Sequence, residues 1–128
     1  MYSIPDPAID TANWASKLTT VQPVPHPSAR ERLPVTLHLH QNDLPDGLDF
    51  GASVAVDSET MGLNLVRDRL CLVQLSAGDG DCHLVQFAAR DYSAPNLRRL
   101  LADPNVAKLF HFARFDLAMI RRHMGIDC

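Results

Sequence analysis

The sequence has 128 residues, of which 46% are hydrophobic and 21% are charged, and its formal net charge is -3. This composition is typical of one small globular domain with a core, and it argues against a disordered chain. The negative net charge excludes a basic field over the whole surface, so nucleic-acid binding would require a local basic patch. We find no apolar run long enough to span a bilayer and no apolar signal core at the N-terminus, which favours a cytoplasmic protein without a membrane partner.

Residues 1–34 differ from the rest of the chain because they hold six of its nine prolines. Proline lacks an N–H donor, so this composition predicts an extended linker or tail. The stretch DTANWASKL at residues 10–18 could instead form a short helix whose Trp14 docks on the domain or on a partner. We therefore expect a Pro-rich extension over residues 1–34 and a folded domain over residues 35–128.

The first predicted strand is VTLHLH at residues 35–40, where apolar and polar residues alternate. Such alternation is typical of a half-buried strand, with one face toward the core and the other toward water. The apolar positions, which we expect to face the core, are Val35, Leu37 and Leu39. His38 and His40 share the other face, and with His26 they permit a metal-site interpretation. A solvated strand face explains these histidines more simply.

Six further elements are predicted downstream of the first strand. They are strands over residues 52–59, 69–77 and 81–87, a helix over 94–103, a strand over 105–112 and a helix over 113–125 that ends at Gly125. The gap before residue 81 is short enough for a hairpin, so the strands on either side of it should be antiparallel. The helix over 94–103 allows a right-handed crossover to a parallel strand. The predicted fold class is therefore α/β: a mixed sheet, with a three-strand meander followed by a crossover, and flanking helices.

Acidic residues follow the predicted strands at the points where those strands end. Asp57 and Glu59 are two residues apart on one strand, so their side chains point to the same face. Asp116 follows the 105–112 strand, which we expect to lie parallel to the strand that carries Asp57 and Glu59. The ends of parallel strands lie side by side, and ligands of open α/β sheets bind at the carboxyl ends of the strands. Three carboxylates without a His or Cys suit Mg²⁺ or Mn²⁺ rather than Zn²⁺. The simpler alternative is that these acids cap a turn and a helix.

Two longer segments extend this pattern. The segment AVDSETMGLNLVRDRLCLVQLS at residues 55–76 resembles the first exonuclease motif and second strand of the ribonuclease D family, within the DEDD superfamily of 3′–5′ exonucleases. The segment LFHFARFDLAMI at residues 109–120 is similar to the second motif of that family. The resemblance covers about residues 35–125. It implies an RNase H-like fold and hydrolysis of single-stranded RNA from its 3′ end with two divalent metal ions, Mg²⁺ or Mn²⁺, while DNA stays open as a substrate.

The resemblance also implies roles for individual residues. Asp57 would contact both metal ions, Glu59 one of them, and Asp116 the second ion through water. The residues expected to contact the terminal nucleotide or its phosphates are Thr60, Met61, Gly62, Leu63, His111, Phe112, Arg114 and Phe115. Phe112 stands where the family usually has Asn. Gln74 and Leu75 match a family segment, but sheet core is the simpler interpretation for both.

The third motif of the family, a Tyr or His four residues before the last acid, is expected beyond residue 128. The sequence thus resembles the N-terminal part of the family domain, incomplete at its C-terminus, and we expect it to be weak or inactive as a nuclease by itself. Its 105–112 strand would be an exposed sheet edge and could support a homodimer. The alternatives are a non-catalytic nucleic-acid-binding or interaction module that keeps the fold, and a split gene product that is not stable alone.

Overall fold

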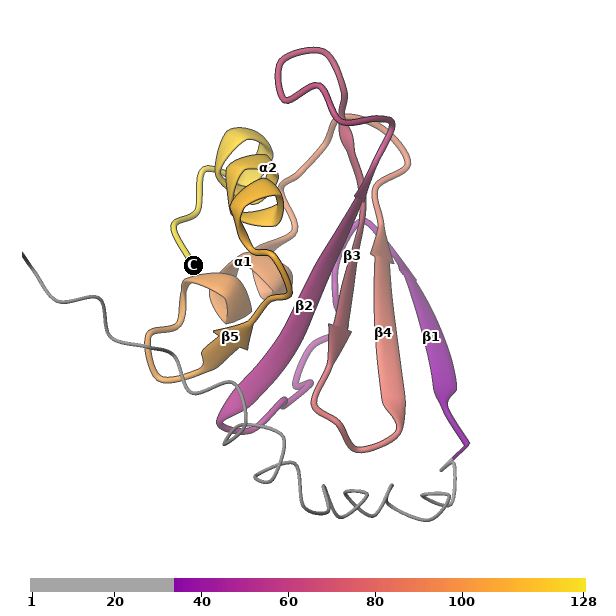
Figure 1. The fold of residues 1–128 in the computed structure, drawn as a ribbon. Coiled ribbons are helices and arrows are strands. Elements are labelled where there is room, and N and C mark those ends of the chain that lie inside the picture. Colours follow the sequence, from indigo (N-terminus) through magenta and orange to yellow (C-terminus); the bar gives the residue numbers. More distant parts are fainter. Residues whose placement is uncertain (1–33) are drawn as a thin grey trace, which may run out of the picture. The chain divides into compact units, whose positions relative to one another are not determined.

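The computed structural model describes residues 34–128, in which five strands form one sheet and two helices pack on it (Figure 1). The strands are β1 (Thr36–Gln41), β2 (Ser53–Thr60), β3 (Leu70–Ser76), β4 (Asp81–Gln86) and β5 (Ala107–Leu109), and the helices are α1 (Pro95–Ala102) and α2 (Arg114–Met124). None of the described helices is long and apolar enough to cross a membrane. The possible helix at residues 10–18 and nearly all of the predicted Pro-rich extension lie outside the described residues, so that division of the chain stays a prediction.

The sheet has the strand order β1-β4-β3-β2-β5. The pairs β2–β3 and β3–β4 are antiparallel, and β5 lies parallel to β2 after the crossover through α1. This confirms the predicted meander, the crossover and the α/β fold class. The short turn between β3 and β4 uses Gly78 and Gly80, whose φ angles of 82° and 102° suit glycine. The first strand, β1, takes the opposite edge of the sheet, parallel to β4.

Both helices cover the same face of the sheet. Their buried side chains share one core with the strands, and this core includes Val54, Val56, Val73, Leu75, Val85, Leu97, Leu101, Met119 and Ile120. Because side chains alternate along a strand, Asp57 and Glu59 of β2 point to the opposite face, and both are exposed. The predicted acidic pair therefore stands on the face that the described helices leave open.

The predicted orientation of the first strand is wrong. Leu37 and Leu39 of β1 are 66% and 59% exposed, whereas His38 and His40 are half-buried on the helix-covered face. The parallel register with β4 sets this arrangement, because it pairs His38 with His83, which is itself buried in the core face. An alternating pattern does not by itself say which face is inside, since a shift of one residue inverts every side chain.

Two further elements differ from their predictions. The strand expected over residues 105–112 is shortened to β5, and the chain then turns at Phe112, whose φ is +57°. The last helix, α2, begins at Arg114 rather than at the predicted residue 113; its buried positions are Asp116, Met119, Ile120 and Met124, and Arg122 is exposed. The predicted end of this helix at Gly125 is confirmed: its φ is +67° and its N–H donates to the carbonyl of Arg121 at 2.8 Å.

The loop between β2 and β3 is held by the buried carboxylate of Asp68. This carboxylate accepts bonds from the Arg67 side chain at 2.7 and 3.1 Å and from the backbone N–H of Asn64 at 2.9 Å. A Cβ at Gly62 would lie 2.3 Å from Oδ2 of Asp68, so any other residue at this position would displace the carboxylate that holds the loop. Arg122 of α2 donates to the carbonyl of Val66 at 2.9 Å and thereby ties the loop to the helix.

We predict that acid opens this loop. The hydrogen bond from Arg67, with that from Asn64, lowers the pKa of Asp68. The stabilisation is therefore fully present above the ordinary carboxyl pKa of about 4 and is lost as the pH falls through the lower pKa of the folded state. Amide hydrogen exchange, corrected for its intrinsic pH dependence, should show residues 61–69 losing protection before the sheet does. The control Asp68→Asn should already exchange faster at neutral pH, and equal protection of the wild-type loop at low and neutral pH would contradict this.

Candidate active site

Two exposed carboxylates stand side by side on the open face of β2. Asp57 pairs with Gln74 across the β2–β3 hairpin, and Gln74 Nε2 donates to Asp57 Oδ2 at 3.4 Å. Glu59 follows on the same face, just before an irregularity in the β2–β3 register at Thr60. Exposure to water allows two like charges to lie two residues apart, and it also leaves their oxygens available to a cation.

The third predicted acid, Asp116, is bound to the backbone between the first two. It lies in the first turn of α2 and is only 7% exposed. Its Oδ1 accepts a bond from the Ser58 N–H at 3.1 Å and another from the Ser58 hydroxyl at 2.5 Å. Since β5 pairs with β2 only over residues 53–55, the Ser58 N–H has no strand partner on that side. The Oδ1 atom of Asp116 thus accepts the hydrogen bond that a neighbouring strand would otherwise accept from this edge of β2. Its Oδ2 atom accepts no hydrogen bond within residues 34–128.

A groove of about 420 Å³ runs over the open face beside this edge. Asp57 and Gln74 form part of its wall, and the lining also includes His111, which follows β5. The groove also includes apolar side chains, among them Leu109 and Cys82. It therefore brings a predicted metal ligand and a predicted nucleotide contact into one depression.

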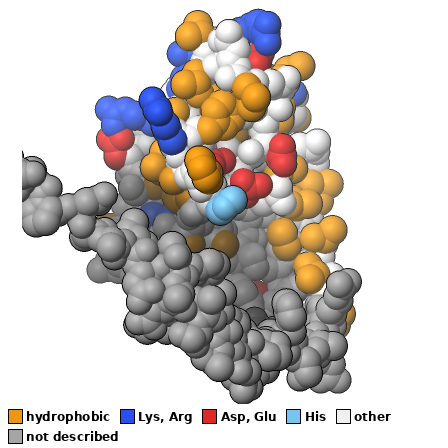
Figure 2. Space-filling view, in the orientation of Figure 1, with side chains coloured by type: hydrophobic (Ala, Val, Ile, Leu, Met, Phe, Trp, Pro, Cys, Tyr) orange, Lys and Arg blue, Asp and Glu red, His pale blue; other side chains and the backbone are white. Residues whose placement is uncertain are grey.

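A second depression, of about 320 Å³, lies between the β2–β3 loop and the start of α2. Its lining consists of Leu65, Phe112, Arg114, Phe115 and Ala118, so it unites three of the predicted substrate contacts. Phe112 is 90% exposed and occupies the left-handed backbone region, where a bulky side chain is rare. Figure 2 shows apolar side chains over the upper part of this view, with acidic side chains and a histidine below them.

The remaining predicted contacts lie along the end of β2 and the loop after it. Thr60 is half-buried, and its hydroxyl donates to the carbonyl of Gly62 at 2.6 Å. Met61 and Leu63 are exposed large apolar residues. A short loop thus presents two apolar side chains to solvent from a backbone that Asp68 holds in place.

The structure does not gather the three predicted acids into one ligand group. Within residues 34–128, the group of metal-ligating side chains whose donor atoms lie within 4.8 Å is formed by His38, Asp81 and His83. The roles of Asp57, Glu59 and Asp116 therefore stay predictions, although the Ser58 bonds link all three through one short stretch of β2.

Sequence reasoning missed three residues of this region. The sequence predicts no role for Ser58, which bonds to Asp116, or for Leu65, which lines the second depression. Gln74 was interpreted as sheet core, yet it is half-buried and contacts Asp57, whereas Leu75 is indeed buried. The hairpin register could have revealed Gln74, because it pairs with Asp57. No signal in the sequence singles out the Ser58–Asp116 pair.

The spacing of the third family motif also occurs within the chain, at His123 and Asp127, and this was missed as well. The structure gives these residues other partners. The His123 ring lies 5.0 Å from that of Tyr92, and Asp127 forms an ion pair with Arg121. Neither lines the groove beside Asp57, so the spacing does not supply a fourth acid there.

We predict that loss of the exposed acid leaves the stability nearly unchanged and that loss of the buried acid lowers it. Asp57→Ala should change the free energy of unfolding by less than about 0.5 kcal/mol, because the side chain is exposed and makes one long hydrogen bond. Asp116→Ala should cost about 1–3 kcal/mol, because it leaves the Ser58 donors without their acceptor. Urea unfolding measures both. Asp116→Asn, which keeps an acceptor oxygen, should lose less than Asp116→Ala, and an equal loss would argue against the Ser58 bonds.

Comparisons with known proteins place this geometry in a family. The model of the 3′-5′ exonuclease family matches residues 38–128. The solved structure of Brucella melitensis NrnC bound to pGG is 45% identical, with a TM-score of 0.67, over 73% of this chain and 46% of that chain. The structure of Brucella melitensis NrnC with bound Mg²⁺ is 46% identical, with a TM-score of 0.68, over 73% of this chain and 47% of that chain. No curated protein matched.

The described chain therefore spans about half the length of the solved structures that it resembles. The family match covers well over half of this chain and includes both segments in which the acidic residues lie. The resemblance noted in the sequence is confirmed at this level, together with the RNase H-like α/β fold. The chain belongs to the 3′–5′ exonuclease family.

Proposed function

We propose that this chain provides the first two motifs of a two-metal site that hydrolyses RNA from its 3′ end. The observation that carries the proposal is the bond between Asp116 and Ser58, because it attaches the acid of the second motif to the backbone between Asp57 and Glu59. Family membership supports the reaction class. The Mg²⁺ in the structure of Brucella melitensis NrnC supports the choice of a divalent cation.

The donor set fits a hard divalent cation. Asp57 and Glu59 offer exposed carboxylates on one face, and Asp116 keeps Oδ2 beside the same strand. These residues would hold Mg²⁺ or Mn²⁺, since both cations favour oxygen ligands. When bound, such a pair of ions activates a water and stabilises the leaving oxygen of a phosphodiester. The side chain of Gln74, bonded to Asp57, would keep that carboxylate oriented.

The two depressions suggest how a 3′ end would be held. Met61 and Leu63 offer apolar contacts to a base, while the exposed guanidinium of Arg114 offers a partner for a phosphate. Phe112 provides an aromatic face on which a base can stack. The pGG in the structure of Brucella melitensis NrnC supports a single-stranded substrate end. We favour RNA over DNA as the substrate and a cytoplasmic location, and both stay predictions.

We further propose that the 128 residues are a weak nuclease by themselves. Two-metal hydrolysis depends on both ions and the water being fixed in position. Three acids near β2, without the fourth acid of the third motif, would hold the ions and the water less firmly. β5 is also an edge strand of the described sheet, with Leu109 exposed, so an isolated chain could pair as a homodimer through it. The second candidate function is nucleic-acid binding without cleavage, and it is favoured by the absence of a three-acid ligand group within residues 34–128.

A nuclease assay on labelled RNA with Mn²⁺ separates these functions. We expect slow shortening from the 3′ end by the chain, lost in Asp57→Asn and Asp116→Asn and unchanged in the control Asp49→Asn, an acid outside both depressions. A longer chain bearing a downstream Tyr/His-x-x-x-Asp segment should be much faster. RNA binding without any Asp57-dependent cleavage in either chain would establish the binding module instead. Robust cleavage by the short chain would contradict the need for a fourth acid.

We predict that Phe112→Asn separates stability from binding. Asn tolerates a positive φ better than Phe, so the variant should be more stable by about 1 kcal/mol. The loss of the exposed ring should at the same time weaken RNA binding several-fold. Thermal melting and fluorescence anisotropy with a short labelled RNA measure the two effects. Phe112→Tyr is the matched control, which should bind like the wild type, and unchanged binding by Phe112→Asn would exclude stacking on this ring.

A further inference from the structure

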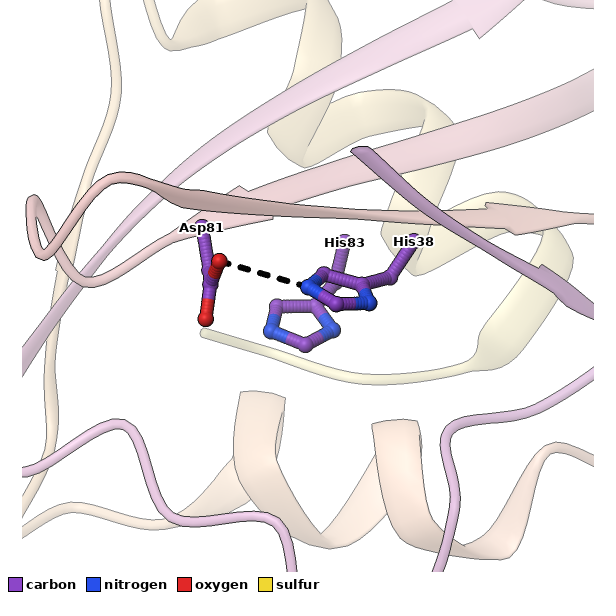
Figure 3. Close-up of side chains that lie close together, drawn as sticks. All are labelled: His38, Asp81 and His83. Carbon is purple, nitrogen blue, oxygen red and sulfur yellow. Dashed lines mark ion pairs between the residues drawn. The ribbon is translucent and has the colours of Figure 1, made fainter. Parts of the chain in front are cut away.

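A group of imidazole and carboxylate side chains lies where β1 and β4 run side by side (Figure 3). Asp81 and His83 are two residues apart on β4, and the parallel register sets His38 of β1 beside His83. The three residues offer donor atoms that all lie within 4.8 Å of one another. His38 Nε2 is 3.3 Å from Asp81 Oδ1. This group shares the helix-covered face with Val85 and is thus separated by the sheet from Asp57 and Glu59.

Among residues 34–128, the ring nitrogens of His38 and His83 are not all engaged in hydrogen bonds. His38 Nε2 is buried and makes no hydrogen bond within the described residues, although the Asp81 carboxylate lies near it. Buried polar atoms are almost always paired, and Nε2 of His38 can be paired by the Asp81 carboxylate, by a water or by a metal ion. His83 is only 8% exposed, and its Nδ1 lies 3.0 Å from Nε2 of His40. That contact fixes the ring of His83 and leaves its other nitrogen available.

The rings of His38, His40 and His83 lie close enough together for the charge on one to affect the others. Burial, together with the neighbouring His38, lowers the pKa of His83 and of His40. A neutral imidazole carries the lone pair that a metal requires. Three adjacent rings could not all be protonated without strong repulsion. A metal ion that binds unprotonated rings would avoid this repulsion, and the carboxylate of Asp81 would attract it.

We propose that His38, Asp81 and His83 form a site for Zn²⁺ or a similar transition metal, with His40 as the hydrogen-bonded support of His83. Two imidazoles and one carboxylate are a common ligand set for Zn²⁺, and they leave a fourth position open. When His83 binds a metal through Nε2, its Nδ1–H donates to Nε2 of His40, as metal-ligating histidines donate the N–H of their other ring nitrogen to a neighbouring acceptor. This site is independent of the proposed nuclease function, because it uses other residues, another face and another class of metal.

The alternative is that the rings simply pack as aromatic core. The ring planes of His38 and His83 differ by only 15°, their centroids are 4.8 Å apart, and Phe50 meets His83 edge-on at 5.3 Å. A metal lies in the plane of each imidazole that binds it, so binding requires the His38 ring to rotate out of its stack on the His83 ring. After this rotation the distance between any two donor atoms would shorten to that between two ligands of a tetrahedral zinc site, roughly 3.3 Å. Rotation about side-chain torsions suffices, since the strands already hold the backbones side by side.

Calorimetric titration of the 128-residue chain with ZnCl₂, in excess Mg²⁺ to occupy oxygen sites, tests the proposal. We expect one Zn²⁺ per chain, with an affinity that falls at least tenfold in His38→Gln and in Asp81→Asn. His111→Gln is the matched control, because it removes an exposed imidazole on the other side of the sheet. It should bind Zn²⁺ like the wild type. Co²⁺ should give the visible absorption of a tetrahedral site in the wild type and in this control only.

Three outcomes would overturn the site. They are no Zn²⁺ binding by the wild type, wild-type affinity in both His38→Gln and Asp81→Asn, and an equal loss in His111→Gln. Circular dichroism verifies that each variant is folded. Asp81→Asn guards against a folding defect, because this side chain is 47% exposed and its replacement disturbs the core least. A melting temperature that Zn²⁺ raises in the wild type and in His111→Gln, but not in Asp81→Asn, would support the site further.

Discussion

The bond from Ser58 to the carboxylate of Asp116 is the contact on which the proposed active site depends. It exists because β5 is short: pairing with β2 stops after Ala55, and the next free N–H on that edge belongs to Ser58. A backbone donor without a strand partner must find another acceptor or water. The first turn of α2 supplies that acceptor from Asp116. The same bond therefore finishes the sheet edge, positions the helix and brings the second motif to the first.

The sheet separates two kinds of chemistry. Its open face carries the exposed carboxylates of Asp57 and Glu59, and the groove beside them is lined in part by His111. Its helix-covered face carries His38 and His83, which are nitrogen ligands in a drier setting. Burial lowers the pKa of His83. The two proposed sites would therefore favour different metals, hard divalent cations on the open face and zinc-like metals on the helix-covered face.

The sequence predicted the parts of the fold that local patterns specify. The hairpins, the crossover helix and the end of α2 at Gly125 depend on turn residues and short spacings, and all were predicted correctly. The sequence could not predict which face of β1 is buried, because an alternating pattern allows either face to point to the core until the partner strand and the register are known. Partners distant in sequence were equally hidden: the N-terminus of α1 is capped by Asp43, whose carboxylate accepts the N–H groups of Asn96 and Leu97.

The candidate site shows the same limit. The motifs predicted Asp57, Glu59 and Asp116 as site residues. The serine that lies between the first two acids and bonds to the third has no recognisable pattern in the sequence. Paramagnetic broadening of amide NMR signals by Mn²⁺ tests the joint site most directly. The account predicts that trace Mn²⁺ broadens the amides of residues 57–59 and 114–117 together, and that Asp116→Asn greatly reduces the effect at both. Broadening near residues 57–59 that leaves residues 114–117 sharp, or that persists unchanged in Asp116→Asn, would contradict it.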